Sequence, residues 1–99
     1  MPRVKANTVK LLLVDDHEVV RVGLRTVLVQ QDRVTVVGEA ATTAEAVREA
    51  ARLKPDVILM DVRLPDGSGV DACREILAVN PQIRVIFLTS YADEIGRAH

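Results

Sequence analysis

Four short apolar runs divide the chain at regular intervals. They lie at residues 9–14, 34–37, 57–61 and 84–88. Runs of this length are typical of strands, and an uninterrupted apolar run indicates a strand that is covered on both faces. The run Val57-Ile58-Leu59-Met60 fits that description best, because it stands between Pro55-Asp56 and the carboxylate of Asp61. We therefore expect it to be the central strand of a sheet.

The segments between these runs carry apolar residues at helical spacing. Helices are expected over residues 17–31, from Thr42 to Leu53, and from Ser68 to Asn80. Thr42 stands three residues before Glu45, which is capping-box spacing, and Ser68 is placed to cap the third helix. The positions expected to face the sheet are Val20, Leu24, Val27 and Leu28, then Ala46, Val47, Ala50 and Ala51, then Val70, Cys73, Ile76 and Leu77. Arg21 and Arg25 are expected on the solvated side of the first helix.

Strands that alternate with amphipathic helices predict βαβ units, which form a parallel sheet with helices on both faces. The 99 residues are enough for one small domain. A hydrophobic content of 48%, with 27% charged residues, indicates a globular chain rather than a disordered one. The expected fold class is therefore α/β, with right-handed crossovers between the strands.

Charge and cysteine content exclude several classes of protein. A formal net charge of -1 argues against binding to nucleic acids or membranes through bulk electrostatics. The single cysteine, Cys73, excludes an internal disulfide and a cysteine-based zinc site, and we expect it to be a small buried residue. No apolar run approaches the ~20 residues of a membrane span. Residues 1–8 are expected to form a loose leader, and the chain is expected to be soluble and cytoplasmic.

Polar side chains follow three of the apolar runs, where the carboxyl ends of parallel strands should meet. The first run ends in Asp15 and Asp16, the third in Asp61, and the fourth in Thr89 and Ser90. Ligands bind at this edge of open parallel sheets. Carboxylates that lie close together repel one another, and a hard cation such as Mg²⁺ removes that repulsion. The pattern predicts a Mg²⁺ site in which Asp61 is the candidate nucleophile toward a phosphoryl group and Thr89 a hydrogen-bond donor.

Simpler interpretations exist for several of the residues in and near this predicted site. Asp15 and Asp16 could serve only to complement the dipole of the following helix. His17 could bind a metal, but Mg²⁺ prefers oxygen ligands, so a helix-start residue is the preferred interpretation. Residues 67–69, Gly-Ser-Gly, lack the lysine of a P-loop and are interpreted as a tight turn.

Three motifs resemble those of the receiver domain of two-component response regulators. They are Leu-Leu-Val-Asp-Asp-His-Glu at residues 12–18, Asp-Val-Arg-Leu-Pro-Asp-Gly-Ser-Gly at 61–69, and Leu-Thr-Ser at 88–90. The first two look most like the NarL/LuxR class, whose members usually carry a C-terminal helix-turn-helix domain that binds DNA. The resemblance implies a flavodoxin-like, doubly wound sheet with strand order 2-1-3-4-5.

The same resemblance implies roles for individual residues. Asp61 would be the phosphoacceptor, and the sensor histidine kinase would be the partner that supplies the phosphoryl group. Mg²⁺ would be held by Asp15, Asp16, Asp61 and the backbone carbonyl of Arg63, and Thr89 would be the switch hydroxyl. The chain would assist its own phosphotransfer and dephosphorylation without being an enzyme in the ordinary sense.

The chain departs from the family pattern after the fourth strand. Residues 9–99 are expected to form a receiver that is incomplete at its C-terminus, without the fifth strand and its lysine. The alternative is therefore an interaction module with a receiver fold that is not phosphorylated, and a homodimer is a further expectation. A flavodoxin-like cofactor binder is disfavoured, because Asp15 and Asp16 would repel a phosphate. A phosphohydrolase with an aspartyl nucleophile is disfavoured because Arg63 stands where such enzymes usually place a second aspartate.

Overall fold

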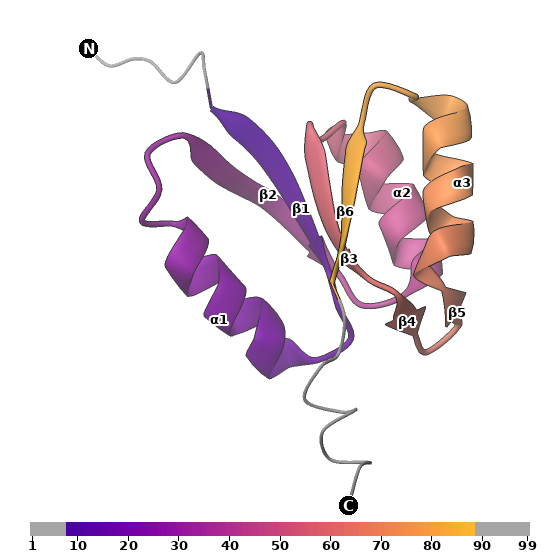
Figure 1. Cartoon of the computed structure of the whole chain (residues 1–99), viewed down its shortest axis with the longest axis horizontal. Helices are drawn as coiled ribbons and strands as arrows, with labels where there is room; N and C mark the ends of the chain where they lie inside the picture. The colour runs from indigo at the N-terminus through magenta and orange to yellow at the C-terminus, as the bar shows by residue number, and fades with distance from the viewer. Residues whose placement is uncertain (1–7, 89–99) are drawn as a thin grey trace, which may run out of the picture.

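The computed structural model describes residues 8–88 and contains a parallel sheet that places the acidic residues at one edge (Figure 1). The strands are β1 (Val9–Val14), β2 (Val34–Ala40), β3 (Val57–Asp61) and β6 (Arg84–Leu88), in the order β2-β1-β3-β6. The helices are α1 (Glu18–Leu28), α2 (Thr43–Leu53) and α3 (Gly69–Val79). The predicted α/β class is confirmed. Because β6 is the fourth strand of this sheet along the chain, the first four positions of the expected order 2-1-3-4-5 are confirmed as well. The sheet continues further along the second strand than expected, because β2 includes residues 38–40.

The register of the sheet brings the carboxyl ends of the central strands level with one another. Val14 of β1 lies opposite Met60 of β3, and Met60 lies opposite Phe87 of β6. Every pairing in this sheet is parallel, so Asp15, which directly follows β1, comes level with Asp61, the last residue of β3. This register is what allows Asp15 and Asp61 to meet.

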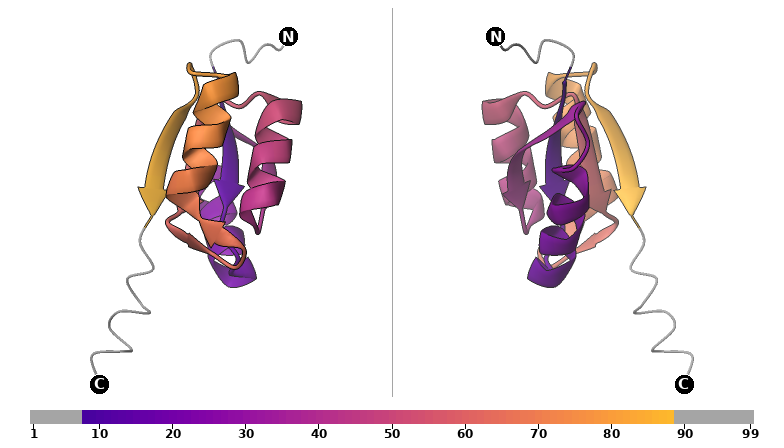
Figure 2. Two further views of the ribbon diagram at one scale, coloured as in Figure 1. Left: turned by 90° about the vertical axis from the view of Figure 1, so that its right-hand side faces the viewer. Right: turned by 90° about the vertical axis from the view of Figure 1, so that its left-hand side faces the viewer.

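Helices cover the two faces of the sheet unequally, as the side views in Figure 2 show: α2 and α3 lie on one face and α1 lies on the other. The core forms under α2 and α3, where apolar strand residues pack against small helical ones. Its buried members include Leu12, Val14, Ile58 and Met60 from the strands and Ala46, Ala50, Ala72 and Ile76 from the helices. Alanines on the helices let their backbones approach the sheet closely, which suits the close packing of protein interiors.

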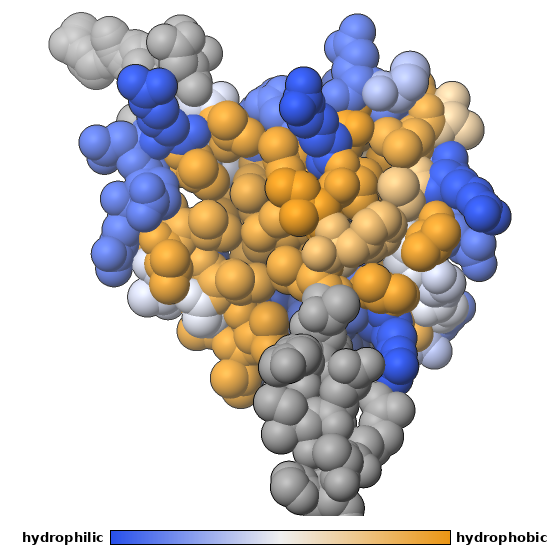
Figure 3. Space-filling view, in the orientation of Figure 1, coloured by the Kyte–Doolittle hydropathy of each residue, from blue (hydrophilic) through white to orange (hydrophobic). Residues whose placement is uncertain are grey.

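The expected burial of the α1 stripe is wrong. No residue of α1 is buried, Val20 and Val27 are exposed, and Leu24 and Leu28 are only partly covered. The physical reason is that α1 lies alone on its face in the described part of the chain and contacts mainly β2. Hydrophobic side chains consequently gather on the surface over β6 and the neighbouring strands (Figure 3).

The predicted helix caps are confirmed. The side chain of Thr42 accepts a hydrogen bond from the backbone N–H of Glu45, and Ser68 accepts one from Val70. The Glu45 carboxylate in turn accepts the backbone N–H of Ala41 at 2.7 Å. Val70 was expected on the buried face of α3 but is exposed, because the buried stripe of this helix passes through Gly69, Ala72 and Ile76 instead.

The expected tight turn at residues 67–69 is wrong, because residues 67–68 form a strand and residue 69 begins α3. Arg63–Leu64 (β4) and Gly67–Ser68 (β5) form a small antiparallel pair, with the turn at residues 65–66. Gly67 has φ +154°, a backbone conformation that residues other than glycine rarely adopt. Asp66 reaches from this turn to α2, where it accepts hydrogen bonds from the backbone N–H and hydroxyl of Thr43 at 2.7 and 2.8 Å.

Two further expectations concern burial and membranes. Cys73 is only partly buried, although it packs against the core as expected. Between residues 8 and 88, none of the helices has the length and hydropathy that a transmembrane span requires. The expected leader lies almost entirely outside the described residues, which include only Thr8 of it.

Candidate functional site

Asp15, Asp16, His17 and Asp61 form a cluster at the carboxyl edge of the sheet. One ligand atom from each of the four side chains lies within 4.8 Å of the others. Asp15 and Asp61 are the buried members, with only 5% and 2% of their surface exposed, whereas Asp16 and His17 face solvent. The expectation that Asp15, Asp16 and Asp61 lie together is confirmed as geometry.

The two buried acids are held by the backbone in the same way. The Oδ1 atom of Asp15 accepts the backbone N–H of His17 at 2.8 Å, and that of Asp61 accepts the N–H of Arg63 at 3.1 Å. Each carboxylate therefore folds back onto the chain two residues later. The backbone N–H of Asp15 also donates to the carbonyl of Ala40 in β2 at 3.0 Å, which fixes the end of β1. Both carboxylates are thus oriented before any ligand arrives.

Gly69 allows the first turn of α3 to pack directly against Asp61. A Cβ atom at position 69 would lie 2.3 Å from the Asp61 carbonyl oxygen and 3.2 Å from the Met60 side chain. The N–H of Gly69 donates to the carbonyl of Val62 at 2.7 Å, which joins the start of the helix to the residue after the acid. Sequence analysis missed this role, although the glycine-rich loop close to an acid was a signal for it.

His17 has two roles in the structure. It stands at the start of α1, and it is a member of the acidic cluster. It is the N-cap residue of α1, as the sequence predicted, but its side chain makes no capping hydrogen bond. Its Nδ1 atom instead lies 2.9 Å from Asp15 Oδ1 and 3.1 Å from Asp16 Oδ1. The side chain of His17 therefore contacts both Asp15 and Asp16, the two acids of the first motif.

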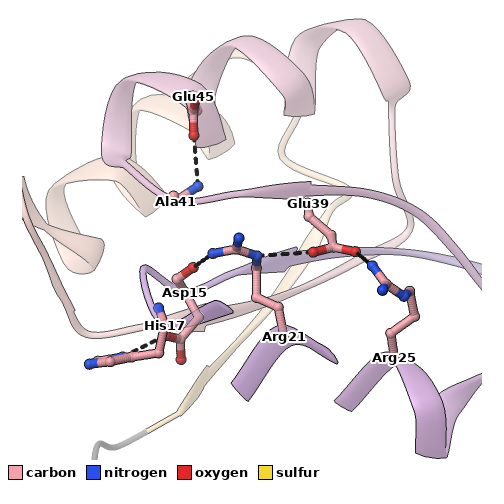
Figure 4. Close-up of polar contacts among 7 residues, drawn as sticks. All are labelled: Asp15, His17, Arg21, Arg25, Glu39, Ala41 and Glu45. Atoms are coloured by element: carbon pink, nitrogen blue, oxygen red, sulfur yellow. Dashed lines mark hydrogen bonds and ion pairs between the residues drawn. The ribbon is translucent and has the colours of Figure 1, made fainter. Parts of the chain in front are cut away.

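The expectation that Arg21 is merely solvated is wrong. Only 18% of its side chain is exposed; its Nε donates to Glu39 Oε1 at 2.9 Å, and Nη1 donates to the carbonyl oxygen of Asp15 (Figure 4). Arg25 pairs with the other oxygen of Glu39. These bonds join α1 to β2 and to the backbone of the acidic cluster. The signal in the sequence was Glu39, an acid next to the apolar run of β2 that needs a partner.

The donor set suits a divalent cation. Three carboxylates at this spacing repel one another, and the oxygen ligands they offer are those that Mg²⁺ and other hard cations prefer. The backbone N–H of Arg63 donates a hydrogen bond to Asp61. That the backbone carbonyl of Arg63 binds the cation stays a prediction. Thr89, the predicted switch hydroxyl, lies outside the described residues.

Comparisons with known proteins give this geometry a context. Residues 11–98 match the family described as "Response regulator receiver domain". The DNA-binding transcriptional activator DevR/DosR of Mycobacterium tuberculosis is 49% identical over 86 residues, which are 87% of this chain and 40% of that protein. The chain thus spans about two fifths of the length of this curated relative.

Solved structures agree with the family match. A LuxR-family two-component response regulator from Aurantimonas sp. SI85-9A1 superposes with a TM-score of 0.79 at 36% identity, covering 83% of this chain and 59% of that one. The signal receiver domain of the putative response regulator NarL from Mycobacterium tuberculosis gives a TM-score of 0.80 at 30% identity, covering 85% and 68%. The chain therefore belongs to the response regulator receiver family, within the NarL/LuxR class of two-component regulators.

Proposed function

We propose that Asp61 accepts a phosphoryl group from a sensor histidine kinase, with Mg²⁺ held by Asp15, Asp16, Asp61 and the backbone carbonyl of Arg63. The observation that carries this proposal is the buried carboxylate of Asp61 at the sheet edge, grouped within 4.8 Å with two further carboxylates in a receiver fold. In such a group a cation offsets the repulsion that burial strengthens.

The chemistry is a transfer between a nitrogen and an oxygen. A carboxylate oxygen of Asp61 attacks the phosphorus atom of the kinase phosphohistidine, the phosphorus–nitrogen bond breaks, and the imidazole leaves with its electron pair. The product is an acyl phosphate. Bound Mg²⁺ would offset the negative charge of the phosphoryl oxygens as they approach the acids. The backbone N–H of Arg63 holds the attacking carboxylate in position, and Thr89 would donate a hydrogen bond to a phosphoryl oxygen.

The output of the switch is also part of the proposal. The relative DevR/DosR is described as a DNA-binding transcriptional activator, and it is more than twice as long as the stretch it shares with this chain. We place this chain in a cytoplasmic regulator of that kind, in which phosphorylation of Asp61 controls transcription through a DNA-binding domain. A receiver fold that serves only as an unphosphorylated interaction module is the competing hypothesis.

Labelling with a ³²P phosphodonor tests the proposal in the protein at its natural length. A small phosphodonor with Mg²⁺ should label the wild type with an acid-stable, base-labile acyl phosphate, and Asp61→Asn should abolish the label, because an amide is not a competent nucleophile. Asp71→Asn is the matched control, because that side chain is 71% exposed on α3 and should label like the wild type. Thr89→Ala should retain most of the label. Absence of label in the wild type would favour the interaction module, and label in Asp61→Asn would show a different acceptor.

A further inference from the structure

The guanidinium of Arg21 joins β2 to the peptide group between two predicted metal ligands (Figure 4). Its Nη1 donates to the carbonyl oxygen of Asp15, which belongs to the peptide bond between Asp15 and Asp16. The strand pairings of β1 end at Val14, so this carbonyl lies beyond the ladder of the sheet and receives its hydrogen bond from a side chain. A peptide group is planar, and fixing its carbonyl therefore fixes the direction in which the chain passes from one acid to the next.

Two neighbouring residues of β2 hold the two polar groups of the Asp15 backbone. The carbonyl of Ala40 accepts the N–H of Asp15 at 3.0 Å. Glu39 holds the Asp15 carbonyl indirectly, because its Oε1 accepts from Arg21 Nε at 2.9 Å while Nη1 of the same guanidinium reaches that carbonyl. The first acid of the site is thus fixed on both sides of its Cα atom by the neighbouring strand.

The surroundings of the guanidinium favour this arrangement. Only 18% of the Arg21 side chain and 25% of the Glu39 side chain are exposed, so salt and water screen their pairing less than at the open surface. The second oxygen of Glu39 pairs with Arg25, so two arginines of α1 share one carboxylate. A guanidinium presents its N–H groups in a rigid fork and can serve a carboxylate and a carbonyl at once, whereas the lysine ammonium is a compact charge on a flexible stem.

We propose that Arg21 is a positioning residue of the phosphoacceptor site, which orients the peptide group between Asp15 and Asp16 so that both side chains face one cation. In this role it contacts neither the cation nor the phosphoryl group and acts through the backbone of the two acids. Groups that orient the ligands of a metal typically contribute about 10- to 100-fold in affinity. This inference rests on the proposed Mg²⁺ site and adds the residue that prearranges it.

The test compares Arg21→Lys with the wild type in the protein at its natural length, because lysine keeps the charge and the helix propensity but loses the fork. Isothermal titration should show Mg²⁺ binding weakened about tenfold or more. Arg52→Lys is the matched control: Arg52 forms an arginine–carboxylate pair with Glu49 on α2, and its replacement should leave the Mg²⁺ affinity unchanged.

Glu39→Gln is a second variant that leaves Arg21 in place. It removes the negative charge between Arg21 and Arg25, so the two cations repel each other and the guanidinium loses its anchor on β2. Mg²⁺ binding should weaken in the same direction as in Arg21→Lys. Thermal unfolding of the metal-free proteins shows which variants fold, and if Arg21→Lys does not, the affinity of Glu39→Gln decides the matter alone.

Carbon-13 NMR of the metal-free protein reads the hydrogen bond itself. Loss of a hydrogen bond to a carbonyl moves its resonance upfield, so the Asp15 carbonyl signal should move upfield in Arg21→Lys and stay in place in Arg52→Lys. This readout depends neither on Mg²⁺ nor on phosphorylation. An Asp15 signal that does not move in Arg21→Lys would overturn the role of Arg21.

Phosphorylation by a small phosphodonor separates positioning from a general effect on the fold. In Arg21→Lys the Mg²⁺ concentration that gives half the maximal labelling rate should rise about tenfold, whereas the rate at saturating Mg²⁺ should stay within about twofold of the wild type. An unchanged Mg²⁺ affinity, or a rate that saturating Mg²⁺ does not restore, would overturn the role of Arg21 while the wild type still takes label. If the wild type neither binds Mg²⁺ nor takes label, the proposed function fails and this inference falls with it.

Discussion

At the scale of single residues, the three acids of the site differ in how much of the fold depends on them. Asp15 and Asp61 are buried and bonded to the backbone, so changing either one disturbs the chain around it. Asp16 is more exposed, and its described polar contact is with the ring of His17. Asp16 is therefore the acid whose replacement reports on the cation with the least effect on folding.

The first prediction follows from this difference. Asp16→Asn should weaken Mg²⁺ binding by about tenfold or more, because it removes a charged ligand and part of the repulsion that favours a cation. Isothermal titration with Mg²⁺ measures the effect, and a thermal unfolding curve of the metal-free variant serves as the control for folding. Equal Mg²⁺ affinity in variant and parent would contradict the metal site.

Asp66 provides a pH-dependent prediction away from the site. The backbone hydrogen bond from Thr43, together with bonds from the Thr43 hydroxyl and the Ala44 N–H, lowers the pKa of Asp66 in the folded protein. A lowered folded pKa means that the stabilisation is present above the unfolded pKa of about 3.9 and is lost as pH falls below it. Asp66→Asn should therefore destabilise the protein near neutral pH, and the difference should shrink in acid, where the protonated parent resembles the amide.

Chemical denaturation of parent and variant at a series of pH values measures that difference. Asp71→Asn is a suitable comparison, because Asp71 is also an exposed acid near the start of a helix but is not held by backbone N–H groups in the same way. A difference in unfolding free energy between Asp66→Asn and parent that stays constant from neutral pH to about pH 2 would contradict the pKa argument.

The residues of the site show how far sequence reasoning reaches. Asp15 and Asp61 could be placed together because both stand at the carboxyl ends of apolar runs, and parallel strands bring these ends to one edge. The contacts of His17 and Arg21 could not be derived in this way. They depend on the direction that α1 takes after β1, and a hydrophobic pattern carries no information about that direction.

At the scale of elements, the strands were predictable and the environment of α1 was not. Uninterrupted apolar runs marked β1 and β3 because strands in the middle of such a sheet are covered on both faces. A similar run marked β6, although this strand lies at one side of the sheet in the described residues. The apolar stripe of α1 predicted an amphipathic helix, but periodicity does not reveal how much of the stripe a neighbour will cover. The tertiary arrangement decides that, and here it leaves much of the stripe exposed.

Two glycines in helices give an element-scale prediction with a built-in control. Gly69→Ala should destabilise the protein by about 1–3 kcal/mol, because the new Cβ would lie 2.3 Å from the Asp61 carbonyl and the start of α3 must move away. Gly23→Ala, in the middle of α1, places its Cβ where no atom lies within 4 Å, and should stabilise by about 0.5–1 kcal/mol. Urea denaturation measures both changes. An unchanged or increased unfolding free energy for Gly69→Ala would show that α3 does not need this close approach.

At the scale of the whole molecule, β6 forms one side of the sheet in the described residues. Its pairing partner there is β3, and no other strand of residues 8–88 lies on its outer side. Ile86 is 51% exposed and Phe87 is 39% exposed, so the strand presents apolar side chains on both faces. The run from Val85 to Leu88 also contains no proline and no charge. A strand edge of this kind is a template for pairing with another chain.

The last prediction is that the 99-residue chain, prepared by itself, does not behave as a monomer. It should dimerise through β6 or aggregate, and size-exclusion chromatography with light scattering should give a mass above the 10.8 kDa of one chain. Ile86→Lys should shift the population toward the monomer, because a lysine on an edge strand opposes pairing with a second copy. Val29→Lys is the matched control: Val29 is 71% exposed at the end of α1, away from β6, and its replacement should leave the association unchanged. A stable 10.8 kDa monomer that unfolds cooperatively would contradict the prediction, and equal effects of the two lysines would show that association depends on general apolar surface rather than on the edge of β6.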